Sequence, residues 1–456
     1  MCGIAGIFGS EEASNLVYLC LYALQHRGQE GAGITSYDGK RIKIIKDFGL
    51  VSEVFSERKK FNYLRGEIAI GHVRYSTHGE SSFINIQPLT FSYKKYHIAI
   101  SHNGNLINLK SLKRELEDRG AIFQTTSDTE FIVHLVAQSK GDIIEERLIN
   151  ALRKVEGAYS LLIMVNDKLI AVRDKYGFRP LCMGKLGNAV VFASETCALD
   201  LIGAEYKRDV NPGEMIIVDK SGLRSIQFEE PRPHYCIFEY VYFSRPDSRI
   251  FGEYVDKTRR KLGRNLAIES PVDDADIVFS IPDSSNTTAL GYAQKANLQY
   301  EIGLIRNHYV GRTFIHPQQM IRDFSVKVKF NPIGGVIKGK KVVIVDDSIV
   351  RGTTLRKLVN LIKKEEPKEI HIRIGSPPIR YPCYYGMDFP SQNELIAYKR
   401  SISEIKEYLD VDSLEYLSVE GLLKSMSLPP EQFCTACFTG KYIEPIREYK
   451  RSKEEI

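Results

Sequence analysis

The sequence predicts two domains in tandem: a layered sandwich of sheets and helices, then an open parallel sheet flanked by helices. A chain of 456 residues exceeds what a single hydrophobic core usually holds. In the first half, apolar runs such as 156–165 and 169–173 follow one another across short turns, as paired strands do. In the second half, helical runs separate the buried strands, which is typical of a parallel sheet. The charged, proline-broken stretch 229–234 divides the chain into residues 2–230 and 231–456.

The composition is that of a globular protein, with 43% hydrophobic and 26% charged residues. A net charge of +6, with both signs interspersed, favours small anionic ligands over a nucleic-acid-coating surface. The sequence shows neither a signal-peptide pattern nor an apolar run long enough for a membrane span, so we expect a cytoplasmic protein. The eight cysteines are interpreted as ligands, nucleophiles or core residues, not as disulfides, with Cys20, Cys182 and Cys197 assigned to the core.

The first residues, from Met1 to Gly9, are small or apolar and predict a strand that begins at the start of the chain. Cys2 follows the initiator, and its small side chain should allow ordinary removal of Met1. Cys2 would then carry a free α-amino group, whose reference pKa of about 8 lets it act as the general base of its own thiol. The alternative is a small buried residue on an N-terminal strand.

Four polar turns in the first half favour the nucleophile over the buried residue. The turn 25–30 follows a helical run, and the turns at 71–79 and 97–105 include or end apolar strands. The fourth, 125–130, begins a helix with a hydroxyl-rich N-cap region. Surface loops alone do not require so many donors beside an N-terminal thiol.

Together these segments resemble the class II glutamine amidotransferase domain, an α+β N-terminal-nucleophile αββα sandwich, over residues 2–230. The resemblance implies that Cys2 attacks the carboxamide of glutamine. It implies an oxyanion hole made by the Asn103 side chain and the Gly104 backbone N–H, which stabilise charge on the amide oxygen.

The same resemblance assigns the residues that hold glutamine. Arg74 pairs with the α-carboxylate and Asp128 with the α-ammonium, matching a guanidinium fork and a carboxylate to their natural partners. Tyr75 and Arg27 belong to loops that close over glutamine, and His102 is a positioning residue and not a base.

The stretch 341–354 in the second half predicts an anion site. Four β-branched residues form a buried strand that ends in Asp346 and Asp347, and the loop 348–354 leads into a helix from residue 355. A helix start offers unpaired N–H groups, and the loop adds glycine and hydroxyls. The two carboxylates suit ribose hydroxyls or a divalent cation. The alternative, a buried strand with a polar turn, leaves two adjacent carboxylates without a partner.

This stretch resembles the phosphoribosyl-pyrophosphate (PRPP) loop of α/β type I phosphoribosyltransferases. The resemblance implies ribose hydroxyls held by Asp346 and Asp347, and magnesium held by these two carboxylates with Ser284. It also implies a lid over the pyrophosphate between residues 309 and 341, with Arg312, Lys338 and Lys340 as cations. The 5′-phosphate would lie against Ser348, Val350, Arg351, Gly352, Thr353 and Thr354.

Four further cysteines remain. Cys236 lies near the start of the second half, Cys383 lies in a loop with no core pattern, and Cys434 and Cys437 form a C-x-x-C. Four thiolates would suit either zinc or an iron–sulfur cluster, and their spacing does not decide between them. Their positions resemble the cluster-bearing branch of the amidophosphoribosyltransferase family, which implies a structural or oxygen-sensing [4Fe–4S] centre.

The order of the two domains also resembles that family. The expected reaction converts glutamine, PRPP and water to 5-phosphoribosylamine, glutamate and pyrophosphate, the committed step of purine synthesis. The family resemblance adds a closed apolar path for ammonia, inhibition by purine nucleotides and a homotetramer. One alternative, another class II amidotransferase such as a hexosamine-phosphate synthase, would carry sugar-isomerase motifs in place of the loop 346–354. The other, a nucleotide-sensing regulator, would lack the constellation around Cys2.

Overall fold

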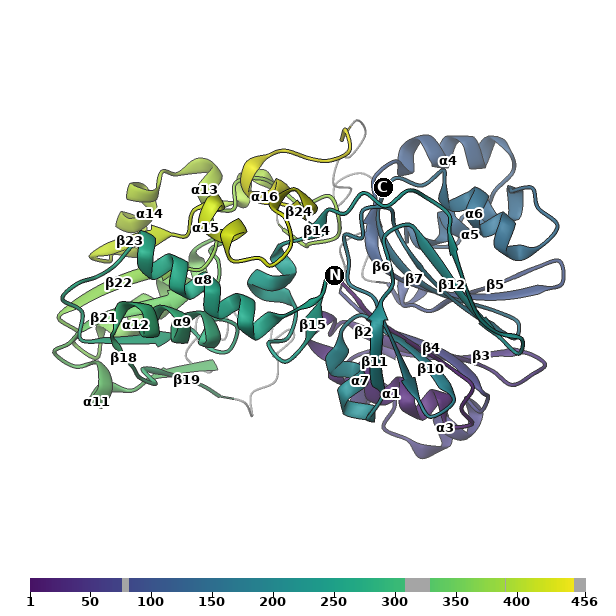
Figure 1. Ribbon diagram of the computed structural model, residues 1–456, viewed down its shortest axis with the longest axis horizontal. Coiled ribbons are helices and arrows are strands. Elements are labelled where there is room, and N and C mark those ends of the chain that lie inside the picture. Colours follow the sequence, from purple (N-terminus) through teal and green to yellow (C-terminus); the bar gives the residue numbers. More distant parts are fainter. Residues whose placement is uncertain (76–81, 308–328, 390, 447–456) are drawn as a thin grey trace.

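The computed structural model describes residues 1–75, 82–307, 329–389 and 391–446. Figure 1 shows two lobes, with the first half of the chain in purple to teal and most of the second half in green to yellow. The N-terminus lies at the join between them. Within these described ranges no helix combines the length and the apolar character that a membrane span needs.

The first lobe contains two antiparallel sheets that pack face to face. Branched and long apolar side chains such as Ile4, Ile70 and Leu162 fill the space between the sheets. The described residues form one sheet of seven strands in the order β11-β9-β10-β1-β4-β2-β3. Its strands are β1 (Gly3–Phe8), β2 (Gly31–Tyr37), β3 (Ile42–Phe48), β4 (Ile68–Arg74), β9 (Cys182–Leu186), β10 (Ala189–Ala193) and β11 (Glu205–Asp209).

The second sheet of this lobe has six described strands in the order β13-β12-β8-β7-β6-β5. Its long central pair turns at Asn166, whose positive φ of 49° suits the tight turn that the sequence predicts there. These strands are β5 (Leu89–Tyr93), β6 (Tyr96–Leu106), β7 (Gly157–Val165), β8 (Lys168–Arg173), β12 (Glu214–Asp219) and β13 (Gly222–Gln227).

Helices cover the outer faces of both sheets, which completes the αββα sandwich and confirms the predicted fold of the first half. Cys20, Cys182 and Cys197 are buried between the first sheet and its helices, as predicted for core residues. The helices of that face are α1 (Ala13–Ala23), α2 (Val51–Val54), α3 (Arg58–Tyr63) and α7 (Thr196–Ile202). Those of the second sheet are α4 (Leu109–Asp118), α5 (Thr129–Gln138) and α6 (Ile144–Leu152), and short turns form η1 (Gln25–Arg27) and η2 (Phe83–Asn85).

The second lobe is built on a parallel sheet with helices on both faces, as predicted. Val343 and Val345 of its central strand point to one core, and Val342 and Ile344 point to the other, because successive strand residues face opposite sides. The order is β18 (Gln299–Tyr300), β17 (Ile277–Ser280), β21 (Lys341–Asp346), β22 (Glu369–Ile374) and β23 (Ser413–Tyr416). One face carries α8 (Val255–Glu269), α9 (Asn286–Ala296) and α15 (Val419–Lys424); the other carries α12 (Thr353–Lys363), α13 (Ile396–Lys399) and α14 (Ile402–Leu409).

Two expectations about this lobe need correction. The strand expected at 301–308 does not join the parallel sheet, because β19 (Leu304–Arg306) pairs with β20 (Phe330–Pro332) in a separate antiparallel ribbon. Helix α12 begins at Thr353 and not at residue 355, because Gly352 adopts the left-handed conformation and ends the loop earlier. A short helix, α11 (Gly334–Ile337), separates β20 from β21.

The segment that joins the lobes lies beside the C-terminal segment. The boundary expected after residue 230 falls between β13 and β14, and β14 (Tyr235–Cys236) pairs in parallel with β24 (Phe433–Cys434). A π-helix, η3 (Glu239–Phe243), follows directly. The remaining elements are β15 (Arg249–Ile250), β16 (Glu253–Tyr254), η4 (Gln392–Glu394), η5 (Pro430–Gln432) and α16 (Ala436–Thr439).

Candidate active site

Cys2 lies immediately before β1, where it meets both sheets of the first lobe. Its backbone nitrogen donates to Asn103 Oδ1 at 3.2 Å, so the facing sheet holds the amino end of the residue. Its carbonyl accepts from Arg27 Nε at 3.0 Å. Its thiol Sγ lies 3.6 Å from the carbonyl oxygen of Tyr75. Cys2 is therefore fixed on three sides while its sulfur faces the turn after β4.

Asn103 and Gly104, the predicted oxyanion hole, are consecutive residues on β6. Asn103 Nδ2 is buried and has no hydrogen-bond partner among the described residues. An unpaired buried donor costs about 1–3 kcal/mol of stability. Such a group needs an explanation, and a ligand oxygen that it would bind is one. At Gly104 a Cβ atom would lie 2.0 Å from the carbonyl oxygen of Ala158, so the backbone here requires glycine.

The two residues predicted to hold the ends of glutamine, Arg74 and Asp128, are tied to each other through Asn85. Arg74 Nη1 donates to the Asn85 carbonyl at 2.9 Å. The side chain of Asn85 bonds Thr126 through both of its polar atoms, at 2.7 and 3.1 Å, two residues before Asp128. Asp128 itself accepts from the backbone of Leu106, two residues after Gly104. A buried guanidinium and a buried carboxylate thus flank the oxyanion donors.

His102 has the surroundings of a positioning residue, as predicted. Its Nδ1 lies 3.1 Å from Thr129 Oγ1, and its Nε2 lies 3.3 Å from the Ala158 carbonyl oxygen. Asp128 Oδ1 is 3.5 Å from the same Nδ1. Both ring nitrogens are engaged inside the lobe, so the ring supports β6 and Asp128.

Arg27 lies in a different place from the one that the sequence suggests. Its side chain is fully buried and contacts the carboxylates of Glu195 and Glu239 in addition to the Cys2 carbonyl. The expected contact of Arg27 with glutamine is therefore corrected to a supporting contact beneath the nucleophile. The carbonyl of Tyr75 lies next to the thiol, and the part of Tyr75 in a loop that closes over glutamine stays a prediction.

The predicted phosphate loop lies between β21 and α12, at the carboxyl end of the parallel sheet. Gly352 is the N-cap of α12 with φ 74°, a conformation that glycine adopts without strain. Thr353 and Thr354 form the first turn of the helix, so their backbone N–H groups are among those without an intrahelical partner. Arg351 is exposed and pairs with Glu394 at 2.8 Å. The loop residues from Ser348 to Thr354 all line one cavity.

Asp346 and Asp347 share a small oxygen-rich site with two serines. Ser284 Oγ donates to Asp347 Oδ1 at 2.6 Å, which brings the predicted magnesium residues together. Ser285, which the sequence did not single out, donates to Asp346 Oδ1 at 3.0 Å. Burial, and then the charge of Asp347, raise the pKa of Asp346 well above its ordinary value. Burial also raises the pKa of Asp347.

A cavity of about 380 Å³ connects the surroundings of Cys2 with the phosphate loop. Met1 and Tyr75 line one end of it, and Asp346, Asp347 and the loop to Thr354 line the other. The wall between the ends is largely apolar and aromatic, and the sequence did not identify any of these residues. They include Phe238, Tyr242, Phe243, Phe330, Met387 and Phe389.

The four cysteines assigned to a metal gather near the join. Cys236 and Cys434 occupy paired positions on β14 and β24. Burial raises the pKa of Cys437, and the neighbouring sulfurs of Cys383, Cys236 and Cys434 raise it further. In the described part of the chain no three His, Cys, Asp or Glu side chains are closed around a metal position. The thiols therefore converge without forming a finished coordination shell.

Of the three cations assigned to the lid, the structure places Lys338 away from the phosphate loop. Arg312 lies outside the described residues. Lys338 pairs with Glu366 at 2.6 Å, beyond the C-terminal end of α12. Since α12 spans residues 353–363 at about 1.5 Å per residue, that position is about 16 Å from the phosphate loop. Lys340 follows α11 on the way into β21 and stays a prediction.

Taken with the fold, these sites define a class of protein: a glutamine amidotransferase joined to a phosphoribosyltransferase. Residues 72–201 match the glutamine amidotransferase domain family, and residues 266–374 match the phosphoribosyl transferase domain family. The chain is 54% identical to amidophosphoribosyltransferase 2, chloroplastic, of Arabidopsis thaliana, over 98% of this chain and 80% of that relative.

Two further comparisons agree. The amidophosphoribosyltransferase of Bacillus subtilis is 47% identical over 97% of this chain and 94% of that protein. The solved structure of B. subtilis glutamine PRPP amidotransferase, complexed with ADP and GMP, has a TM-score of 0.92 at 47% identity and covers 98% of both chains. The chain belongs to the amidophosphoribosyltransferase family.

Proposed function

We propose that the protein transfers the amide nitrogen of glutamine to PRPP, in the first committed step of purine synthesis. Glutamine, PRPP and water give glutamate, 5-phosphoribosylamine and pyrophosphate. The observation that carries the proposal is the cavity of about 380 Å³, which has Met1 and Tyr75 beside Cys2 at one end and the phosphate loop at the other. A nitrogen released near Cys2 therefore has a route through this cavity to a sugar bound at Asp346 and Asp347.

In the glutamine half, the mature α-amino group of Cys2 takes the thiol proton and the sulfur attacks the carboxamide carbon. The position of the Cys2 nitrogen against Asn103 Oδ1, at 3.2 Å, keeps that amine beside the thiol. The orphaned Asn103 Nδ2 is the donor for the developing oxyanion. Ammonia leaves, and water then cleaves the thioester to glutamate. Arg74 and Asp128 hold the amino-acid end of the substrate.

In the PRPP half, ammonia forms a bond to the anomeric carbon while pyrophosphate leaves with the electron pair of the broken C–O bond. The first turn of α12 and Gly352 hold the 5′-phosphate. Asp346, Asp347 and Ser284 offer only oxygen atoms, a donor set that suits magnesium. Ser284 donates to Asp347 at 2.6 Å and Ser285 donates to Asp346 at 3.0 Å, so these side chains lie together. Bound there, magnesium would neutralise charge on the departing pyrophosphate.

The lining of the cavity supports transfer of ammonia without loss to water. Phe238, Phe243 and Phe389 contribute aromatic surface between the two ends. An apolar wall carries neutral ammonia without protonating it, whereas a wall of acids would trap ammonium. Met1 lines the same cavity, so its removal both frees the amine of Cys2 and enlarges the route.

We further propose that Cys236, Cys383, Cys434 and Cys437 hold a [4Fe–4S] cluster that pins the C-terminal segment to the join. The paired positions of Cys236 and Cys434, and the mutual influence of all four sulfurs, support a shared site. Burial raises the pKa of Cys236 to about 11, although the charge of Arg179 opposes the rise. A positive metal centre would replace this protonated state with thiolates.

Anaerobic purification is expected to give a brown protein with about four irons per chain. The measurement is iron and acid-labile sulfide per chain, together with the visible spectrum. Cys434→Ser should lose most of the iron, whereas the matched core variant Cys20→Ser should keep it, because Cys20 is buried between α1 and α7. A colourless protein with one zinc per chain would contradict the cluster.

Regulation, assembly and location complete the proposal. The related B. subtilis enzyme was solved with ADP and GMP, and we propose that purine nucleotides inhibit this protein as well. We also propose a homotetramer and a cytoplasmic location; the Arabidopsis relative is named as chloroplastic.

One coupled assay tests the joint reaction. Glutamate release and pyrophosphate formation are measured in the same reaction, with and without PRPP and with ammonium in place of glutamine. We expect glutamate and pyrophosphate in a ratio of about one when both substrates are present, because one nitrogen serves one sugar. Glutamate release that ignores PRPP, with no pyrophosphate formed, would refute the proposed reaction.

A further inference from the structure

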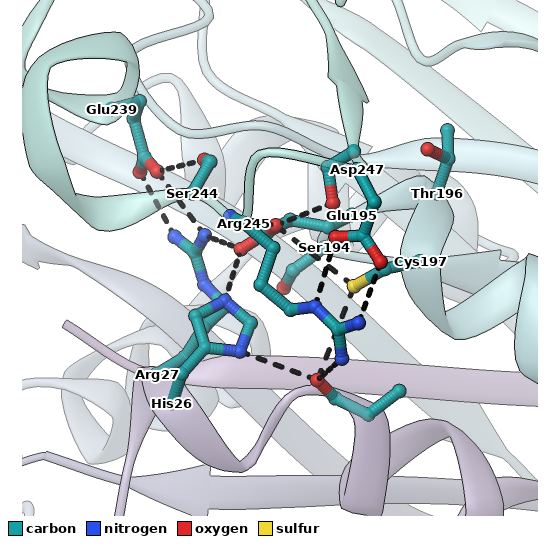
Figure 2. Close-up of polar contacts among 12 residues, drawn as sticks. His26, Arg27, Ser194, Glu195, Thr196, Cys197, Glu239, Ser244, Arg245 and Asp247 are labelled. Atoms are coloured by element: carbon teal, nitrogen blue, oxygen red, sulfur yellow. Dashed lines mark hydrogen bonds and ion pairs between the residues drawn. The ribbon is translucent and has the colours of Figure 1, made fainter. Parts of the chain in front are cut away.

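A buried ionic cluster crosses the join between the two lobes (Figure 2). We call it the join cluster; Arg27 and Glu195 come from the first lobe and Glu239 from η3 at the start of the second. All three side chains have 0% exposure. Although burial opposes it, His26 and Arg27 hold the pKa of Glu195 well below its ordinary value. The join cluster is therefore charged and shielded from water.

Both carboxylate oxygens of Glu239 accept hydrogen bonds from Arg27. Its Oε1 accepts from Arg27 Nη2 at 2.9 Å, and its Oε2 accepts from Nη1 at 3.1 Å. Ser244 Oγ donates to Oε2 at 2.7 Å and fixes the rotation of the carboxylate. A fork-to-fork pair of this kind sets the angle of the guanidinium as well as its place. The Arg27 guanidinium also lies 4.7 Å from the centre of the Phe243 ring.

The remaining edge of the same guanidinium holds the nucleophile. Arg27 Nε donates to the Cys2 carbonyl at 3.0 Å. Rotation of the guanidinium plane would move that donor. The carbonyl carbon of Cys2 is bonded to its Cα, which carries the amine and, through Cβ, the thiol. Glu239, from the second lobe, thus sets the orientation of a catalytic residue in the first.

A purely stabilising role explains this arrangement poorly. Buried ion pairs recover little more than their desolvation cost, and well-packed apolar residues often replace them without loss of stability. An apolar pair would fill the space between η1 and η3 but would not hold the Cys2 carbonyl. The charged pair fixes the direction in which Arg27 Nε points, and an apolar pair would not do so.

The opposite side of η3 is connected to the PRPP site. Arg259, on α8, donates to the carbonyl of Tyr240, within η3, at 2.7 Å and to that of Ser244, its C-cap, at 2.8 Å. The same guanidinium donates to the Ser284 carbonyl at 3.3 Å. Ser284 Oγ in turn donates to Asp347. Continuous hydrogen bonds therefore run from Asp347 through η3 to Cys2, and π-helical turns are common at functional sites.

We infer that Glu239 is a positioning residue for glutamine hydrolysis, and that η3 transmits occupation of the PRPP site to Cys2 through the Glu239–Arg27 pair. The inference rests on the proposed function. When PRPP and its cation engage Asp347 and Ser284, the segment held by Arg259 adjusts, and Glu239 moves with η3. Glutamine hydrolysis then depends on PRPP because the second lobe completes the support of Cys2.

The test uses Glu239→Gln in the full-length protein, which removes the charge but keeps the shape. We expect the glutamine-dependent kcat to fall about tenfold or more, because a charge-assisted contact to Arg27 is lost. The rate of glutamate release with PRPP, divided by the rate without it, should fall at least about fivefold. The ammonia-dependent rate should change by less than about twofold, since the phosphate loop is untouched.

Two further variants keep the test decisive if Glu239→Gln destabilises the fold. Glu239→Asp retains the charge. Its glutamine-dependent kcat, and its ratio of glutamate release with PRPP to that without, should both lie between those of the wild type and of Glu239→Gln. Asp247→Asn is the matched control, because Asp247 pairs with Arg245 in the same segment but is 54% exposed. It should behave as the wild type. Thermal unfolding of each variant reports whether the fold is kept.

The inference is overturned if folded Glu239 variants keep the wild-type PRPP dependence, or if ammonia- and glutamine-dependent rates fall equally, as a merely structural role predicts. If the wild-type protein itself forms no pyrophosphate from PRPP, the proposed function fails and the inference fails with it. If the wild-type protein couples glutamate release to pyrophosphate formation and Glu239→Gln behaves as the wild type does, the inference is overturned while the proposed function stands.

Discussion

Replacement of Cys2 by alanine is expected to remove glutamine-dependent formation of phosphoribosylamine, with a loss of at least about 1,000-fold. The sulfur is the atom of Cys2 left to attack the carboxamide beside Asn103, because the nitrogen and carbonyl of Cys2 are held by Asn103 and Arg27. With ammonium in place of glutamine, activity should remain, because the phosphate loop and Asp346 lie at the other end of the cavity.

The measurement compares pyrophosphate release from PRPP with glutamine and with ammonium as nitrogen donors. Cys20→Ala is the matched control, since Cys20 is also a buried thiol of the first lobe but packs between α1 and α7. Its glutamine-dependent rate should stay within about threefold of the wild type. A Cys2→Ala enzyme that still uses glutamine would show that another group is the nucleophile.

Asp346→Asn is expected to abolish the use of PRPP while making the protein harder to unfold. The variant should lose at least about 100-fold in activity with either nitrogen donor, because ribose and magnesium lose a carboxylate. Its melting temperature should rise by about 2–4 °C, the shift for about 1 kcal/mol in a domain of this size. The gain arises because burial and the charge of Asp347 disfavour ionised Asp346.

The sign of the pH dependence distinguishes this explanation from better packing. A carboxyl whose folded pKa is raised binds its proton more tightly when folded, so its contribution to stability is present at low pH and is lost as the pH rises through the folded pKa. Asparagine does not titrate. The advantage of Asp346→Asn should therefore grow as the pH rises above the ordinary carboxyl value of 3.8.

Melting curves across pH, with magnesium and PRPP absent, provide the measurement. Asp410→Asn serves as the control, because Asp410 is in the same lobe but is 77% exposed and pairs with Lys363. A uniform stabilisation across pH, or full activity in Asp346→Asn, would contradict the assigned role of Asp346.

The groups that act on substrate could be predicted from sequence because each is local. Cys2 stands directly before an apolar strand, and Asp346 ends one, so the strand delivers each to a sheet edge. Asn103 was also found from its local pattern, although it lies within β6 and not in the polar turn that the sequence predicted there. The strand 342–346 and the helix after it form one continuous signal of this kind. Such signals depend on neighbours within about ten residues, and the structure keeps them.

Contacts between distant segments could not be predicted in this way. Glu239 lies 212 positions from Arg27, and one acid in an apolar run, Ile237–Phe243, was the only sign of it. The edge strands β18 and β23 are two and four residues long, too short for a periodic pattern. The segment at 304–306 has the composition of a strand, but only its pairing with β20 decides which sheet it joins. Arg27 was misassigned for the same reason.

The burial of Met1 has a consequence for how the enzyme matures. Only 1% of Met1 is exposed, and its sulfur lies against the buried guanidinium of Arg179. A peptidase needs an accessible, extended chain end to cleave the bond before Cys2. With Met1 in this place the bond before Cys2 is shielded, so we expect its cleavage to precede closure of the lobes. On that expectation, a chain that folds with Met1 attached keeps the amine of Cys2 capped, and the timing of one cleavage sets how many molecules use glutamine.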